Sequence, residues 1–351
     1  MKEQEVAAER QRERERKRRE DLERRRPAIE RALKAYRATD DRDVLEVRIR
    51  TGFIQTTDPR RTAARPAGND YSLAADIESR PPMTKFVERR RHSLQLLMTM
   101  FYVARMEASP GQQFVNDHPN INPKGTKASW LTLAGLNESV PPTQRRNLRR
   151  SFNTAVDALA ARDLVALHGT PGFSGRYRNF ALQTEDGTNT PYTVPGDNLP
   201  NREAISLSTS FFREGWHLVL TDHELVTLLA IIDRTGALRR TPRSGTVRDE
   251  GVDLKESVRY GTYGLSDEAY NTVHMLHRLG LITGKDPMPN RRSQIKLVGF
   301  PIDGSGIVDP AHPAGPEKVD FNERVPYRLI YPIRGKEFGS ALDKVFDTLA
   351  S

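Results

Sequence analysis

Cysteine is absent from all 351 residues, so disulfides, thiol catalysis and cysteine-ligated zinc or iron–sulfur sites are excluded. Aromatic residues make up only 7% of the chain, and no apolar run approaches the roughly 20 residues that a membrane-spanning helix needs. The first residues also lack the apolar segment of a signal peptide. We therefore expect a cytoplasmic protein with no membrane partner.

Several catalytic signatures are missing as well. Gly284 and Lys285 are followed by Asp286 and lack the upstream glycine of a P-loop. The metal motif HExxH does not occur, nor does the His-apolar-His pair of nicking enzymes, and His274 and His277 have no carboxylate at ligand spacing on their helix face. The acids between 233 and 253 form no arrangement typical of a nuclease. We predict no enzyme activity, no cofactor and no metal.

Positive charge is in excess, because 55 Lys and Arg oppose 46 Asp and Glu, a net charge of +9. Such a balance favours an acidic partner, first nucleic acid and second an anionic membrane surface. Arginine greatly outnumbers lysine, which suits phosphate binding. A GC-rich genome explains the same excess equally well.

Composition and periodicity divide the chain into six segments. They are a charged, mostly helical N-terminal extension (1–42), a strand and linker (43–83), a first folded unit (84–183), a second linker (184–202), a second folded unit (203–302) and a C-terminal strand and helix (303–351). In the N-terminal extension, Leu22, Ile29, Leu33 and Tyr36 begin an apolar stripe. This segment is either a frayed charged tail, a dimerising helix or a basic arm along phosphates.

Both folded units have the same order of elements: helix, short helix, helix, strand, turn, strand. The first unit has helices at about 85–105, 129–136 and 142–162, with strands at 164–167 and 179–183. The second has helices at about 221–233, 253–260 and 266–279, with strands at 281–283 and 295–300. Thr221 and Glu224 have the spacing of a capping box, and a further strand (325–331) and a helix follow.

The ends of the third helices, AVDALAARDLVALHG (155–169) and VHMLHRLGLITG (273–284), resemble winged-helix proteins, in which a recognition helix runs into the first strand of a β-hairpin. The fold class predicted is mainly α with small β-hairpins (α+β), with two winged-helix domains in tandem and a charged N-terminal helix. The tandem arrangement is similar to that of plasmid replication initiators and of some bacterial regulators.

The helix predicted at 142–162 has the pattern of a recognition helix. Leu148, Phe152, Ala155 and Leu159 form its inner face, Pro142 suits its first turn, Thr143 can help to cap it, and no acid occurs between Thr143 and Val156. The residues expected to contact DNA are Thr143, Gln144, Arg145, Arg146, Arg149, Arg150 and Asn153. The alternative is a solvated charged face.

The remaining expected DNA contacts are weaker in pattern. On the helix predicted at 266–279 they are Tyr270, Asn271, His274 and Arg278, although that helix could instead be a dimerisation surface. In the hairpin turns they are Arg176, Arg178, Arg291 and Arg292, since glycine and arginine let a turn approach phosphate. Plain turns explain the same residues.

These observations predict a bacterial, nucleoid-associated protein that binds double-stranded DNA in a sequence-specific way. Its role is replication initiation on a plasmid or mobile element, or transcription regulation, with homodimerisation as a further option. The alternative is a non-catalytic scaffold that uses winged helices and the N-terminal helix to bind protein. RNA binding is less favoured, because the chain lacks the aromatic pattern of an RNA-recognition sheet.

Overall fold

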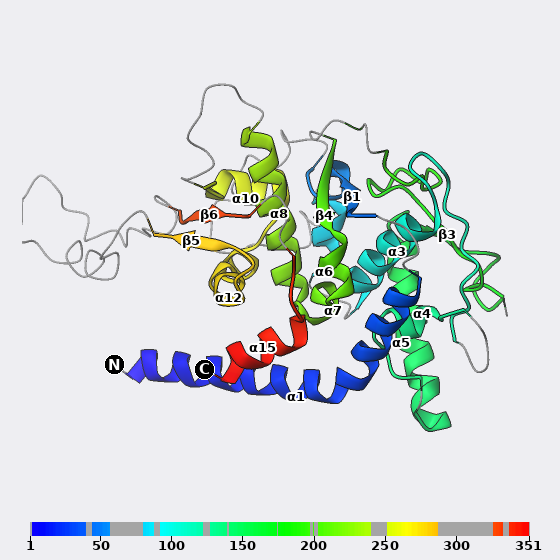
Figure 1. The fold of residues 1–351 in the computed structure, drawn as a ribbon, viewed down its shortest axis with the longest axis horizontal. Coiled ribbons are helices and arrows are strands. Elements are labelled where there is room, and N and C mark those ends of the chain that lie inside the picture. The colour runs from blue at the N-terminus through cyan, green and yellow to red at the C-terminus, as the bar shows by residue number, and fades with distance from the viewer. Residues whose placement is uncertain are drawn as a thin grey trace, which may run out of the picture.

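The structure is a computed structural model that describes most of the chain. The described residues are 2–39, 44–56, 80–87, 92–121, 127–138, 140–173, 175–196, 199, 203–239, 251–286, 326–332 and 337–350. Helices and small antiparallel sheets make up the fold (Figure 1). Within the described residues, no helix has both the length and the apolar character needed to cross a membrane.

The N-terminal extension is a single long helix, α1 (Lys2–Ala38), with Pro27 inside it. The predicted stripe is confirmed, because Leu22, Ile29, Leu33 and Tyr36 are all buried. The helix bends part-way along its length (Figure 1), as expected where a proline removes a backbone hydrogen bond. The second half of α1 is thus part of the core.

The first unit follows the predicted order. Its elements are a 3₁₀ turn η3 (Pro82–Phe86), α3 (Ser93–Glu107), α4 (Trp130–Leu133), α5 (Pro142–Ala160), β2 (Val165–Ala166) and β3 (Ala181–Leu182). The helix predicted from about 85 begins only at Ser93, and Ser129 caps α4 by accepting a hydrogen bond from the Thr132 amide. The strands β2 and β3 are antiparallel but shorter than predicted.

The second unit is built on the apolar helix α8. Its elements are β4 (Ala204–Ser208), α6 (Thr209–Arg213), α7 (Trp216–Val219), α8 (Asp222–Arg239), α10 (Glu256–Tyr263), α11 (Asp267–Asn271), α12 (Val273–Arg278) and β5 (Thr283–Lys285). The predicted capping box is confirmed: the Thr221 amide donates to Glu224 Oε2 (2.9 Å), and the Glu224 amide donates to Thr221 Oγ1 (3.3 Å).

The partner of β5 is β6 (Arg328–Ile330), from the strand predicted separately in the C-terminal segment. Val252 forms a bridge to Leu329 on the other side of β6. The strand predicted at 295–300 lies outside the described residues. The small sheet of the second unit therefore has the order Val252, β6, β5.

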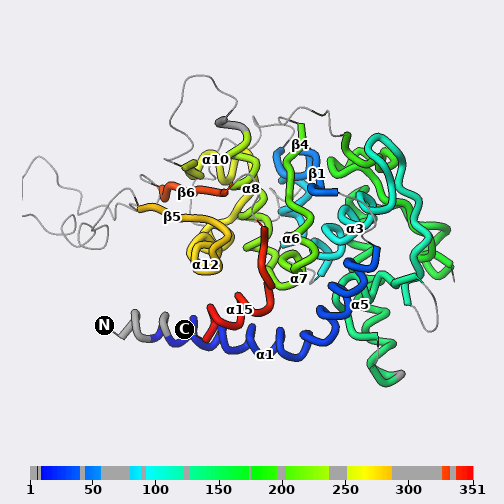
Figure 2. The backbone as a smooth tube through the Cα atoms, in the orientation of Figure 1, coloured from blue at the N-terminus to red at the C-terminus, as the bar shows by residue number. Residues whose placement is uncertain are grey.

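The segments outside the two units pack on both of them. The strand β1 (Glu46–Arg50), which leads into the 3₁₀ turn η1 (Thr51–Phe53), pairs antiparallel with all five residues of β4. In the segment predicted as the second linker, Glu185 and Tyr192 are buried, and Arg50 forms an ion pair with Glu185 (2.6 Å). The C-terminal helix α15 (Ala341–Ala350) runs beside α1 (Figure 2). The buried residues form one continuous hydrophobic core.

Candidate nucleic-acid interface

Helix α5 is anchored by its C-terminal half. Phe152, Ala155 and Leu159 are buried as predicted, and so is Val156. Leu148, which was also predicted on the inner face, is only half-buried. Helix α5 packs against α3, and because its buried side chains lie in this half, its earlier turns extend beyond the core (Figure 1).

The N-terminal half of α5 presents arginines to solvent. Thr143, Gln144, Arg145, Arg146, Arg149 and Arg150 are all exposed, and Asn153 is half-buried. Arg145 donates a long hydrogen bond to the Val140 carbonyl (3.4 Å). In the described part of the chain, Arg146, Arg149 and Arg150 form no ion pair. Three guanidinium groups are therefore available to a partner.

The start of α5 lacks two of the features that stabilise a helix end, although Pro142 lies in the first turn as predicted. Pro141 is the N-cap and makes no side-chain cap hydrogen bond, so the prediction that Thr143 helps to cap the helix is wrong. No acidic residue lies in the first turn, although acids there would stabilise the helix dipole and arginines oppose it. A helix end that breaks a local stability rule is typical of a functional surface.

The β2–β3 hairpin is fixed against α5. Asp157 of α5 accepts a hydrogen bond from the Tyr177 hydroxyl (2.8 Å) and lies 3.9 Å from Arg176 Nε. Arg176 also donates to the Gly169 carbonyl (2.7 Å). Burial and the Asp157 carboxylate both raise the pKa of Tyr177.

The two arginines predicted in this turn therefore differ. Arg176 is half-buried and holds the turn together through protein acceptors, which corrects the view of it as a free phosphate ligand. Arg178 is exposed and suits that role.

The corresponding helix of the second unit is interrupted. The segment predicted as one helix is divided into α11 and α12 at Thr272, and Ser266 caps α11 by accepting from the Ala269 amide. Tyr270, predicted to point outward, is buried, and the Arg259 guanidinium lies 4.4 Å from its ring centroid. Asn271 and His274 are exposed, and the His274 ring contacts Tyr327 edge-on.

The charges at the start of α11 differ in sign from those at the start of α5. Asp267 and Glu268 occupy the first turn of α11 and are both exposed. Arg259 forms an ion pair with Asp267 (2.7 Å), but Asp267 remains largely solvated. Two acids at the start of this helix would repel phosphate, where α5 carries arginines. Arg291 and Arg292 lie outside the described residues.

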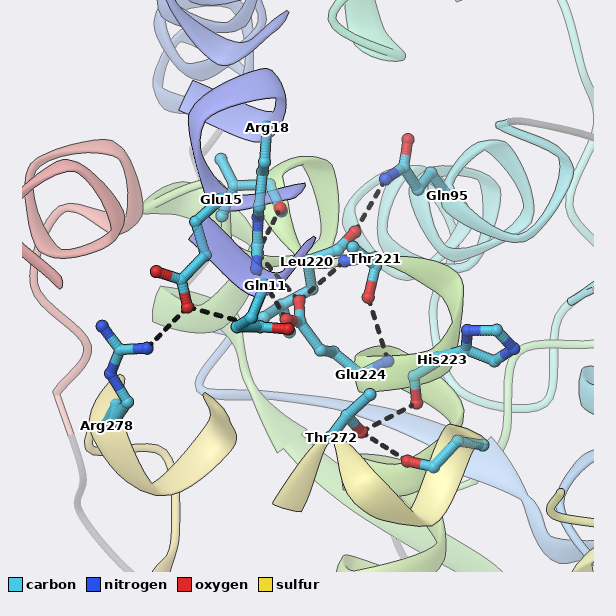
Figure 3. Close-up of polar contacts among 12 residues, drawn as sticks. Gln11, Glu15, Arg18, Gln95, Leu220, Thr221, His223, Glu224, Thr272 and Arg278 are labelled. Atoms are coloured by element: carbon cyan, nitrogen blue, oxygen red, sulfur yellow. Dashed lines mark hydrogen bonds and ion pairs between the residues drawn. The ribbon is translucent and has the colours of Figure 1, made fainter. Parts of the chain in front are cut away.

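Arg278 of α12 is held by two other helices. It forms an ion pair with Glu15 of α1 (2.8 Å; Figure 3) and donates to the Thr348 carbonyl of α15 (2.7 Å). Close by, Arg18 of α1 forms an ion pair with Glu224 (2.6 Å), the capping-box residue of α8. Arg278 therefore connects elements of this chain, where the sequence predicted a DNA contact.

Among the described residues of the first unit, one cluster has the composition of a metal site. Glu107, Asp117 and His118 bring their ligand atoms within 4.8 Å of one another. Lys127 also lies there, with its Nζ 3.1 Å from a Glu107 oxygen and in contact with Asp117. Because the Lys127 ammonium already pairs with both carboxylates, the cluster is an ion-paired clasp between the end of α3 and the loop that precedes α4.

Sequence reasoning missed two features of the interface. The first is the set of polar contacts that Asp157 makes with Tyr177 and Arg176, because these residues are too far apart in sequence to suggest a contact. The second is Phe173, an exposed aromatic residue in the hairpin turn. The only sequence signal for Phe173 is its position among Gly169, Gly172 and Gly175.

Comparisons with protein family models, with curated proteins and with solved structures gave no significant match. What the interface binds must therefore be inferred from its own residues.

Proposed function

We propose that the protein binds double-stranded DNA in a sequence-specific way, with α5 of the first unit in the major groove and the β2–β3 hairpin on the adjacent backbone. The observation that carries this proposal is the surface of α5, with exposed Arg146, Arg149 and Arg150 and no acid before Asp157. Arginine forks match guanine edges and phosphates, and Asn153 suits adenine.

The order of elements supports winged-helix folds for both units. In the second unit, α8, Val252, α10, α11–α12, β5 and β6 follow one another, and β6 is the middle strand of the sheet. In the first unit, α5 leads directly into the β2–β3 hairpin. A helix followed by a hairpin is the arrangement that places a recognition helix and a wing on DNA.

The acids of α11 and the engaged Arg278 make the first unit the main DNA-binding module in this proposal. Asn271 and His274 remain candidates for a secondary contact. Two biological roles suit such a binder, namely replication initiation on a plasmid or mobile element and transcription regulation. Sites that cluster as repeats near an origin support the first role, and sites at promoters support the second.

The test is to recover fragments of sheared genomic DNA on the pure protein near physiological salt and to sequence them. We expect enrichment of one motif, which the triple variant R146A/R149A/R150A loses. The matched control is R16A/R19A/R24A, which removes the same charge from exposed positions of α1. Equal loss in both variants would reject specific reading by α5, and no enrichment by the native protein would favour the scaffold alternative.

Salt dependence gives a second readout. If about 6 phosphates are neutralised, the slope of log affinity against log salt is near −5. Loss of the three α5 arginines should flatten this slope by up to about 3. The α1 control variant should keep the native slope.

A further inference from the structure

Phe173 is one of the few large apolar side chains that the described residues leave in water, with 57% of its surface exposed. It lies in the turn of the β2–β3 hairpin, directly after Gly172, whose φ is +93°. A single exposed apolar residue needs no explanation by itself. Phe173 is distinguished by the glycines that its ring contacts and by the position of its turn beside α5.

The ring of Phe173 lies against two glycines. A Cβ placed on Gly169 would be 2.9 Å from the ring, and a Cβ placed on Gly175 would also be 2.9 Å from it. Side chains at either position would displace the ring, so only glycine permits this arrangement. The ring therefore rests on its own turn while a large part of its surface stays in water.

The turn that carries the ring is hydrogen-bonded and joined to α5. The Phe173 amide donates to the Thr170 carbonyl (3.1 Å), and the Arg176 amide donates to the Phe173 carbonyl (3.1 Å). The contacts of Asp157 with Tyr177 and Arg176 then fix the hairpin beside the basic helix. Because position and orientation are set before binding, the ring would lose little conformational freedom on contact.

We propose that Phe173 is a wedge that inserts between base pairs of the duplex bound by α5, and that it kinks the DNA. This inference rests on the proposed function. Apolar side chains of minor-groove binders unstack a base step in this way, and the cost of unstacking is offset by the additional contacts that bent DNA makes. Exposed Arg178 lies in the same turn, where its charge suits the phosphates on either side of an opened step.

The experiment measures DNA bending by energy transfer between dyes at the two ends of the recovered fragment. 2-Aminopurine placed across the site reports unstacking. We expect the native protein to bend the fragment and to raise 2-aminopurine fluorescence at one step. F173A should lose both signals and bind about tenfold more weakly, while it keeps the native sequence preference, because the side chains of α5 are unchanged.

Two further variants serve as controls. F173W retains a large ring and should preserve the bend. V115A removes another strongly exposed apolar residue of the first unit (75% exposed) and should change neither signal. Bending by F173A equal to that of the native protein would overturn the wedge while leaving DNA binding intact. Failure of the native protein to bind any fragment would instead reject the proposed function itself.

Discussion

The ion pair between Arg18 and Glu224 should determine whether α1 stays docked on the second unit. The Arg18 side chain is 15% exposed and that of Glu224 is 4% exposed, so both charges are withdrawn from water. Arg18 also donates to the Val219 carbonyl (3.1 Å). Substituting Arg18 by methionine leaves the Glu224 carboxylate buried without its counter-charge.

The size of the effect can be bounded from the structure. Removal of one partner of a buried ion pair costs about 3–5 kcal/mol. Glu224 keeps the hydrogen bond from the Thr221 amide, so the lower end of this range, about 3 kcal/mol, is expected. The double variant R18M/E224Q removes both charges and should recover part of the loss.

Hydrogen exchange of the α1 amides is the direct assay, because undocking of a helix can occur without global unfolding. About 3 kcal/mol corresponds to roughly a hundredfold faster exchange in the docked part of α1. Arg16 is the matched control, since its pairs with Glu13 and Glu20 are exposed on the same helix. Unchanged exchange in R18M, or equal change in R16M, would refute the anchoring role.

Three further predictions concern the core. Burial lowers the pKa of His217 from 6.5 to about 3. Between these two pH values the unfolded chain binds a proton at this side chain and the folded chain does not, so the free energy of unfolding should fall as the pH drops through this range. The urea midpoints at pH 7 and pH 5 should therefore differ less in H217Q than in the native protein. F152A should lower the free energy of unfolding by about 3–5 kcal/mol in urea titrations, because it empties a buried site under α5. Gly251 and Gly280 share a positive φ (+73° and +71°). A Cβ at Gly251 would lie 2.8 Å from the Leu329 carbonyl oxygen, whereas a Cβ at Gly280 would have no atom within 4 Å. G251A should therefore lower the melting temperature more than G280A does, and equal melting temperatures would contradict this.

Local features of the chain could be predicted from sequence. The apolar stripe of α1 repeats at helical spacing, and the capping box of Thr221 and Glu224 depends on residues three apart. The amphipathic pattern of α5 likewise identified its buried half. In each case the pattern is contained within a single helix, so it can be recognised without knowing which elements that helix packs against.

Features that depend on tertiary contacts were not predictable in the same way. Tyr270 was expected outside, but it is buried and the Arg259 guanidinium of another helix, α10, covers its ring. The pairing of β5 with β6 joins segments separated by a long stretch of chain. The engagement of Arg278 depends on two helices from opposite ends of the sequence.

The third helix of the first unit (α5) and that of the second unit (α11–α12) carry charges of opposite sign at their N-terminal ends. In α5 this end carries Arg145 and Arg146, whereas in α11 it carries Asp267 and Glu268. Phosphates that approach both units together would be attracted by one and repelled by the other. The proposed DNA contact is therefore asymmetric. Loss of Arg278 should loosen α1 and α15, with little change in the salt slope of DNA binding, because its charge is already paired with Glu15.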